Sequence, residues 1–225
     1  MAPRRRPLAA AVRSERQTAT GATARRRSPG GAPAAVGIRV KSGWATAVLV
    51  LGSTAARRVA DRRVIELCDR AVPESRQPYH AVLGASAGQG ARVEHRLVRI
   101  VQDSTRRSIN TLLKDYRKRG HALRAVALVV GSVIDPSTIG NDHIRAHALE
   151  GRLFRTALER AVRSFRLPCS VLVERDAYAK AATVLGRPAG ALKRAVTELG
   201  RALAGPWRAD EKTATLAAWM ALHNR

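Results

Sequence analysis

Apolar residues follow three patterns along the chain, and together these patterns predict alternating strands and helices. Continuous apolar runs that end at Gly, Pro or charged residues predict buried strands at 36–53, 125–135 and 170–176. A segment alternating basic and apolar residues predicts another strand around 58–67. Apolar positions three and four residues apart predict helices at 91–119, 141–165, 177–185, 192–204 and 210–223.

The segment 70–90 contains two prolines and three glycines, which predicts a loop with room for a short strand near 79–83. The chain then opens with antiparallel strands and continues with strand–helix–strand crossovers. Because such crossovers place helices on both faces of a sheet, we expect one α/β domain over 36–225 with a mixed sheet. This is the element order of the RNase H-like fold.

Residues 1–35 differ sharply in composition from the rest. They hold eight arginines against the single acid Glu15, and otherwise mostly Ala, Pro, Gly, Ser and Thr. Such a segment has little apolar surface to bury, so we expect a disordered tail. Its arginines would add salt-sensitive affinity for phosphates, but an organellar transit peptide or a solvated segment without function has the same composition.

The whole chain is strongly basic, with 41 Lys and Arg against 17 Asp and Glu and a net charge of +24. This balance favours DNA or RNA as a partner, although the excess of Arg and Ala is also typical of GC-rich coding. The longest apolar run, 45–51, is too short for a membrane span. Cys68 and Cys169 form no metal or disulfide motif, which suits a reducing, cytoplasmic compartment.

Three short segments carry a resemblance to a known family. They are Gly37–Ile38–Arg39–Val40–Lys41–Ser42–Gly43–Trp44, then Ala148–Leu149–Glu150–Gly151–Arg152, and finally the segment 192–202 with its Ala195–Val196–Thr197 core. In outline the chain resembles the RuvC-type Holliday-junction resolvases of the RNase H-like superfamily. That resemblance implies a cluster of acids holding two metal ions that cut a phosphodiester.

The chain departs from this pattern where it matters for chemistry. The resemblance implies an acid on the opening strand, where this sequence has Arg39 and Lys41, and another on the last helix, near Lys212 and Thr215. A cation does not bind Mg²⁺ and repels it at short range. We therefore expect an altered or lost metal site.

The alternative is a working nuclease that uses Mg²⁺ or Mn²⁺. Its candidate catalytic residues are the acids at predicted strand ends and at the start of the last helix: Asp135, Glu174, Asp176, Asp210 and Glu211. Ligand sites in open α/β sheets lie at the carboxyl ends of strands. Acids at such positions also often cap the following helix.

Residues that suit nucleic-acid contacts lie on the opening strand and in the 75–80 loop. They are Arg39, Lys41, Trp44, Arg76 and His80, since cations contact phosphates and rings stack on bases. The helix 91–119 adds a basic face. The loop can equally be a connector, and the basic face can simply be solvated.

His143, His147 and Glu150 are spaced so that they share one helical face, which could bind a metal ion or lie in solvent. The sequence contains no Walker motif, no GxSxG and no zinc-finger spacing. We predict a nucleic-acid-binding RNase H-like protein with an altered metal site. The alternative functions are the nuclease and a basic module that binds an acidic protein. The sequence is also compatible with a homo-oligomer.

Overall fold

The computed structural model describes residues 32–53 and 56–223, so the expected tail lies outside the described residues except for 32–35. Five strands form one sheet in the order β3-β2-β1-β4-β5. Their bounds are β1 (Pro33–Val40), β2 (Trp44–Gly52), β3 (Arg57–Glu66), β4 (Ala122–Val130) and β5 (Cys169–Val173). The first three strands pair antiparallel, while β1–β4 and β4–β5 are parallel. The predicted mixed sheet is confirmed.

The opening of the chain differs from the prediction in one respect. The single strand expected over 36–53 is wrong, because a tight turn at Lys41–Ser42–Gly43 divides it into β1 and β2. The Lys41 N–H donates to the Trp44 carbonyl at 2.9 Å, and Gly43 adopts a φ of +83°, which favours glycine. The segment near 79–83 is also not a strand: two 3₁₀ helices, η1 (Pro73–Arg76) and η2 (His80–Val82), occupy this loop.

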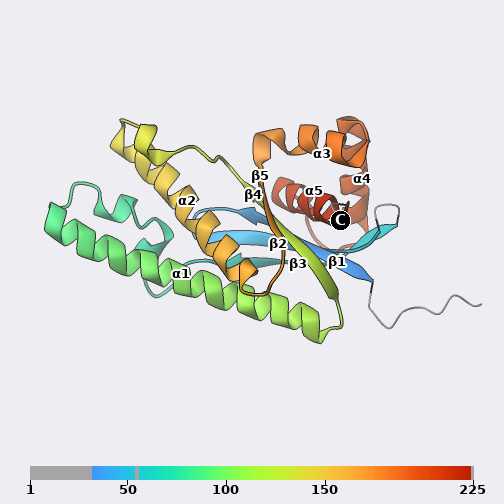
Figure 1. The fold of residues 1–225 in the computed structure, drawn as a ribbon, viewed down its shortest axis with the longest axis horizontal. Helices are drawn as coiled ribbons and strands as arrows, with labels where there is room; N and C mark the ends of the chain where they lie inside the picture. Colours follow the sequence, from blue (N-terminus) through green and yellow to red (C-terminus); the bar gives the residue numbers. More distant parts are fainter. Residues whose placement is uncertain (1–31, 54–55, 224–225) are drawn as a thin grey trace, which may run out of the picture.

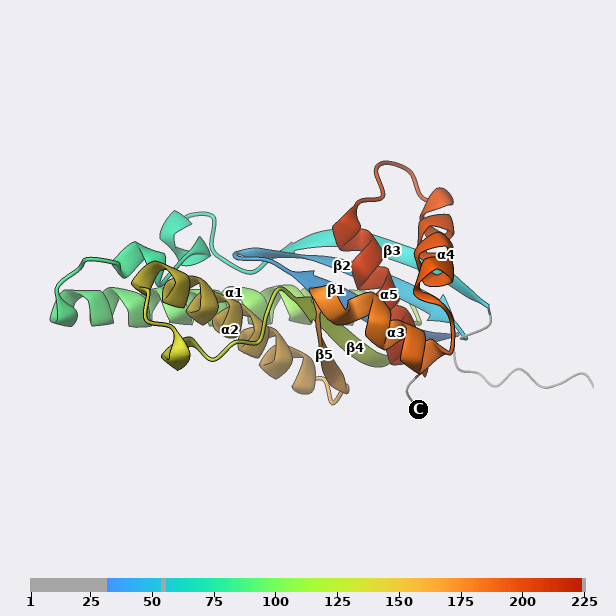
Figure 2. The same cartoon turned by 90° about the horizontal axis from the view of Figure 1, so that it is seen from above.

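Helices cover both faces of the sheet, as Figures 1 and 2 show. One face packs against α1 (Ala87–Lys118) and α2 (Asp142–Arg163), and the other against α3 (Ala177–Leu185), α4 (Ala189–Arg201) and α5 (Ala209–His223). Asn141 caps α2 by accepting the Ile144 N–H at 3.0 Å, which explains where that helix starts. The short helices η3 (Pro136–Thr138) and η4 (Glu174–Asp176) follow β4 and β5.

The alternation of side chains along β1 decides which residues face which layer. Ile38 belongs to the core beneath α1 and α2, whereas Ala35 belongs to the core beneath α5. Gly37 lies on the α5 side, where a Cβ atom would be only 1.7 Å from the Ala214 carbonyl oxygen. The backbone of α5 therefore rests directly on β1, and Arg39, two residues on, points toward the same helix.

Figure 2 shows α1 and the start of α2 extending past the sheet, together with η1 and η2. Among the described residues, no helix has the length and apolar character needed to cross a bilayer. Cys68 and Cys169 are both free thiols. Burial raises the pKa of Cys169 to about 11.

Candidate nucleic-acid interface at the carboxyl ends of β1 and β4

Arg39 lies at the centre of the candidate site, with a side chain only 5% exposed. Its Nε donates to Glu174 Oε1 at 3.0 Å, and its Nη2 pairs with the other oxygen of that carboxylate. Its Nη1 donates to the Val40 carbonyl at 2.7 Å and, more weakly, to the Val129 carbonyl at 3.4 Å. The planar guanidinium of Arg39 thus makes a bidentate contact with Glu174 and also donates to backbone carbonyls of β1 and β4.

A second acid approaches Arg39 from α5. Asp210, in the first turn of α5, places Oδ1 3.7 Å from Arg39 Nε and 3.2 Å from Lys41 Nζ. An acid at this end of a helix also interacts favourably with the helix dipole. Two cations and two carboxylates sum to zero formal charge, so this cluster is neutral without a metal ion.

Arg39 and Lys41 differ in how far their side chains are exposed. Arg39 is buried, while Lys41 lies at the rim with a side chain 35% exposed. Of the five candidate acids, Glu174 and Asp210 both pair with Arg39. Within residues 32–53 and 56–223, no three carboxylates come together closely enough to hold a metal ion.

The other three candidate acids make separate contacts. Asp135 is exposed and accepts the Ser137 N–H at 3.0 Å, a bond that caps η3 and lowers the pKa of the carboxyl. Asp176 lies 3.7 Å from its neighbour Arg175, and Glu211 lies 3.5 Å from Arg62. Asp135 therefore has the capping contact that its position after a strand also predicted.

A pocket of about 240 Å³ opens beside Arg39 and Lys41. Its walls come from the ends of β1 and β4 and from α2, and include Ser42, Gly131, Ser132 and His147. Carboxyl ends of parallel strands are where open α/β sheets bind ligands. The pocket combines cationic side chains with the exposed residues Gly131 and Ser132, a combination that suits a phosphate group.

Two of the remaining nucleic-acid candidates, Arg76 and Trp44, lie near the turn between β1 and β2. Arg76, the last residue of η1, is exposed, and its stem passes so close to Gly43 that a Cβ there would lie 2.6 Å from Arg76 Cγ. Trp44 opens β2 opposite Glu66 of β3 and is half-buried. The basic residues of α1 are all exposed: Arg92, Arg96, Arg99, Arg106, Arg107, Lys114, Arg117 and Lys118.

His80 lies in a group that the sequence reveals only in part. It meets His143 and His147 of α2, and the nitrogen atoms of the three side chains lie within 4.8 Å of one another. The helical spacing of His143, His147 and Glu150 predicted a shared face. The contact with His80 was missed because it joins segments more than sixty residues apart, and no local pattern signals it.

Comparison with known proteins gives a fold and no family assignment. No family model matches the chain, and no curated protein matches it. RuvC of Thermus thermophilus, solved in complex with a Holliday junction substrate, is similar with a TM-score of 0.50 at 11% identity, over 83% of this chain and 90% of that one.

Two further solved structures have TM-scores below 0.5 and carry no weight here. Another T. thermophilus RuvC structure has a TM-score of 0.45 at 14% identity, over 83% of this chain and 92% of that one. The yeast mitochondrial Holliday junction resolvase Ydc2 has 0.43 at 12% identity, over 88% and 83%. At such identities a likeness establishes fold alone. The chain thus has the RNase H-like fold, in an arrangement similar to that of RuvC.

Proposed function

We propose that the protein binds nucleic acid at the carboxyl ends of β1 and β4 without cutting it by a two-metal mechanism. The observation that carries this proposal is the cluster in which the buried Arg39 pairs with the carboxylates of Glu174 and Asp210. The internal cation beside these acids supports the altered metal site expected from the sequence.

Electrostatics argues against a magnesium ion at this position. Two unit charges 4 Å apart interact with about 4 kcal/mol at an effective dielectric of 20, so the guanidinium by itself would repel a divalent ion beside it by about 8 kcal/mol. Mg²⁺ also needs carboxylate oxygens, and Glu174 and Asp210 already use theirs on Arg39 and Lys41. Binding Mg²⁺ would require Arg39 to leave a site where it is 4% exposed.

The surface around the pocket supports a polyanionic ligand. Lys41 and the exposed Arg76 lie at this end of the sheet, and the chain carries a net charge of +24. RuvC, which has a similar fold, was solved with a Holliday junction substrate, so branched DNA is a sensible first probe beside duplex and single strands. Phosphate contacts of this kind give affinity that falls with salt and ignores sequence.

The test is a titration of the full chain with labelled branched, duplex and single-stranded DNA across a salt series. Lys41→Gln should weaken binding to all sequences equally and make the slope of log K against log salt less negative by about 0.9. The matched control is Lys180→Gln, which removes an exposed lysine from α3 and should leave the slope unchanged. Salt-independent affinity, or equal effects of both variants, would refute the proposal.

A second measurement separates binding from cleavage. The same DNA is incubated with the protein and Mg²⁺ or Mn²⁺, and we expect it to stay intact. Metal-dependent cutting that Glu174→Gln and Asp210→Asn abolish would establish the nuclease alternative instead. A protein that binds none of these nucleic acids would favour the basic protein-interaction module.

A further inference from the structure

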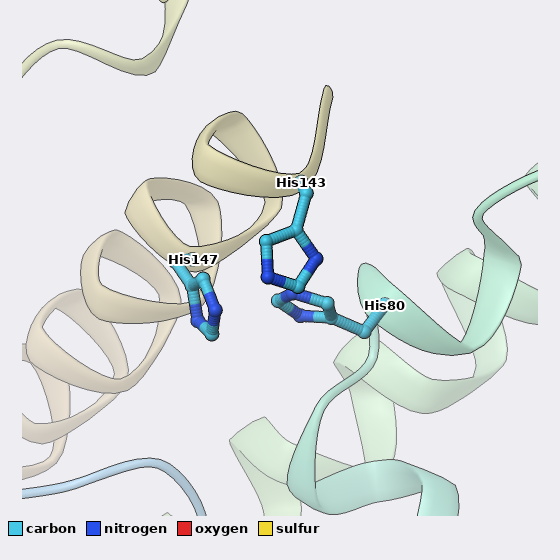
Figure 3. A group of neighbouring side chains, drawn as sticks. All are labelled: His80, His143 and His147. Carbon is cyan, nitrogen blue, oxygen red and sulfur yellow. The ribbon is translucent and has the colours of Figure 1, made fainter. Parts of the chain in front are cut away.

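Three imidazole rings converge outside the Arg39 cluster, between η2 and α2. His143 and His147 lie one turn apart on α2 and point toward His80, the first residue of η2 (Figure 3). The ring centroids are 4.8 Å apart for His80 and His143, 4.2 Å for His80 and His147, and 4.8 Å for the two α2 histidines. One ring nitrogen from each histidine lies within 4.8 Å of the other two, which is the arrangement of a group that can bind one metal ion.

A buried carboxylate stands behind this group. Glu150 has no exposed surface, and its Oε1 lies 2.8 Å from His80 Nδ1 and 3.4 Å from the His80 backbone nitrogen. With neutral His80, Nδ1 carries the proton donated to Glu150, so Nε2 carries the lone pair. Histidines that bind metals almost always donate their other N–H in this way, commonly to a carboxylate.

Two buried polar atoms lack partners at the same place. Among the described residues, neither His80 Nε2 nor Glu150 Oε2 has a hydrogen-bond partner, although both atoms are buried. Leaving a buried acceptor unpaired is costly, and so is burying a carboxylate without a counter-charge. His147 Nδ1 is 3.8 Å from Glu150 Oε2, so the same carboxylate also stands near a second ring.

We propose that His80, His143 and His147 bind a divalent transition-metal ion, with Zn²⁺ as the expected occupant, and that Glu150 orients the ligands from behind. Imidazole suits Zn²⁺, Cu²⁺, Ni²⁺ and Fe²⁺, whereas Mg²⁺ prefers oxygen. The ion would engage the lone pair of His80 Nε2 and offset the buried charge of Glu150. Three histidines leave a fourth position open around a tetrahedral ion.

The distances allow this with a small side-chain adjustment. Around a tetrahedral ion with bonds of about 2.0 Å, nitrogen ligands lie about 3.3 Å apart, against a largest separation of 4.8 Å here. His143 and His147 are exposed, which leaves room for their side chains to adjust, while Glu150 pairs with His80. His147 also lines the pocket beside Arg39, so the ion would stand at the edge of that pocket.

The experiment uses the full chain, stripped with a chelator and dialysed, and titrated with Zn²⁺ by calorimetry and with Co²⁺ by visible absorption. We expect one ion per chain, a tetrahedral Co²⁺ spectrum and a higher melting temperature with Zn²⁺. His143→Ala should abolish all three effects and still fold, because His143 is exposed. His223→Ala, an exposed histidine at the end of α5, is the matched control and should bind as the wild type does.

Glu150→Gln tests the orienting role, and should weaken Zn²⁺ binding by about 10–100-fold if the variant folds. A wild-type titration without a saturable one-to-one step would overturn the proposal. So would Zn²⁺ binding that His143→Ala leaves unchanged, because the ion would then be held elsewhere. The site borders the pocket proposed for nucleic acid through His147. The inference does not rest on nucleic-acid binding, because these metal titrations contain no DNA.

Discussion

Replacing Arg39 by Met tests the ion-pair cluster most directly. The variant keeps a flexible apolar stem of similar length but removes the charge that faces Glu174 and Asp210. Breaking a buried ion pair by removing one partner costs about 3–5 kcal/mol, because the other charge is left unpaired. Here the acid side chains are 37% and 23% exposed, so water relieves part of that cost and we expect a loss of about 3 kcal/mol.

Urea unfolding followed by far-ultraviolet circular dichroism would measure this loss. Thermal unfolding gives a second measure. For a domain of this size, a loss of 1 kcal/mol lowers the melting temperature by about 2–4 °C, so the variant should melt about 6–12 °C below the wild type. Arg175→Met is the control, because its side chain is 84% exposed and meets Asp176 at 3.7 Å. It should change the free energy of unfolding by less than about 0.5 kcal/mol.

The double variant Arg39→Met with Glu174→Gln gives the decisive comparison. Removing both charges should cost less than the sum of the single changes, since the unpaired carboxylate is then gone. If Arg39→Met costs no more than Arg175→Met, or if the two changes simply add, the cluster does not stabilise the fold and the reasoning fails.

Two further predictions concern the packing at Gly37, with Gly151 as its control, and the ionisation of the buried Tyr116. Gly37→Ala should cost about 3 kcal/mol, because the new Cβ would lie 1.7 Å from the Ala214 carbonyl oxygen; Gly151→Ala, with nothing within 4 Å of its Cβ, should be neutral or stabilising by urea unfolding. Tyr116 is buried and donates to Asp61 at 2.7 Å, and burial with this bond raises its pKa. The unfolded tyrosine therefore ionises first, above pH about 10, and stability falls as pH rises further, by up to about 1.4 kcal/mol per pH unit from this group. Tyr116→Phe should make that alkaline decline shallower, and an unchanged slope would contradict the assignment.

The element pattern could be read from the sequence because it depends on local periodicity. All five helices lie within a few residues of their predicted bounds, and the strand directions follow from the order of elements. The turn at 41–43 was missed because the residues on both sides of it favour strands, and the turn itself has a single glycine. The prediction reached the right topology but missed the turn at 41–43. It also placed a possible strand near 79–83 where η2 lies, and it extended the strands over 125–135 and 170–176 beyond Val130 and Val173, where β4 and β5 end.

The site was predictable where topology alone brings residues together. Glu174 follows β5 at the carboxyl edge of the sheet and does meet Arg39 of β1. Asp135 does not join them, because β4 ends at Val130 and the chain leaves the sheet before reaching it. His80 and Glu150 are joined by tertiary packing across 70 positions, which no spacing rule detects.

The absence of a side chain at Gly37 has an effect at a distance. The backbones of β1 and α5 are in direct contact at Gly37. No side chain lies between them that could change rotamer, so the distance between β1 and α5 is fixed there. Asp210 is carried by the same helix, so that distance sets how far its carboxylate stands from the guanidinium. The small size of Gly37 in β1 thus helps to set the distance between Asp210 and Arg39 at the end of the same strand.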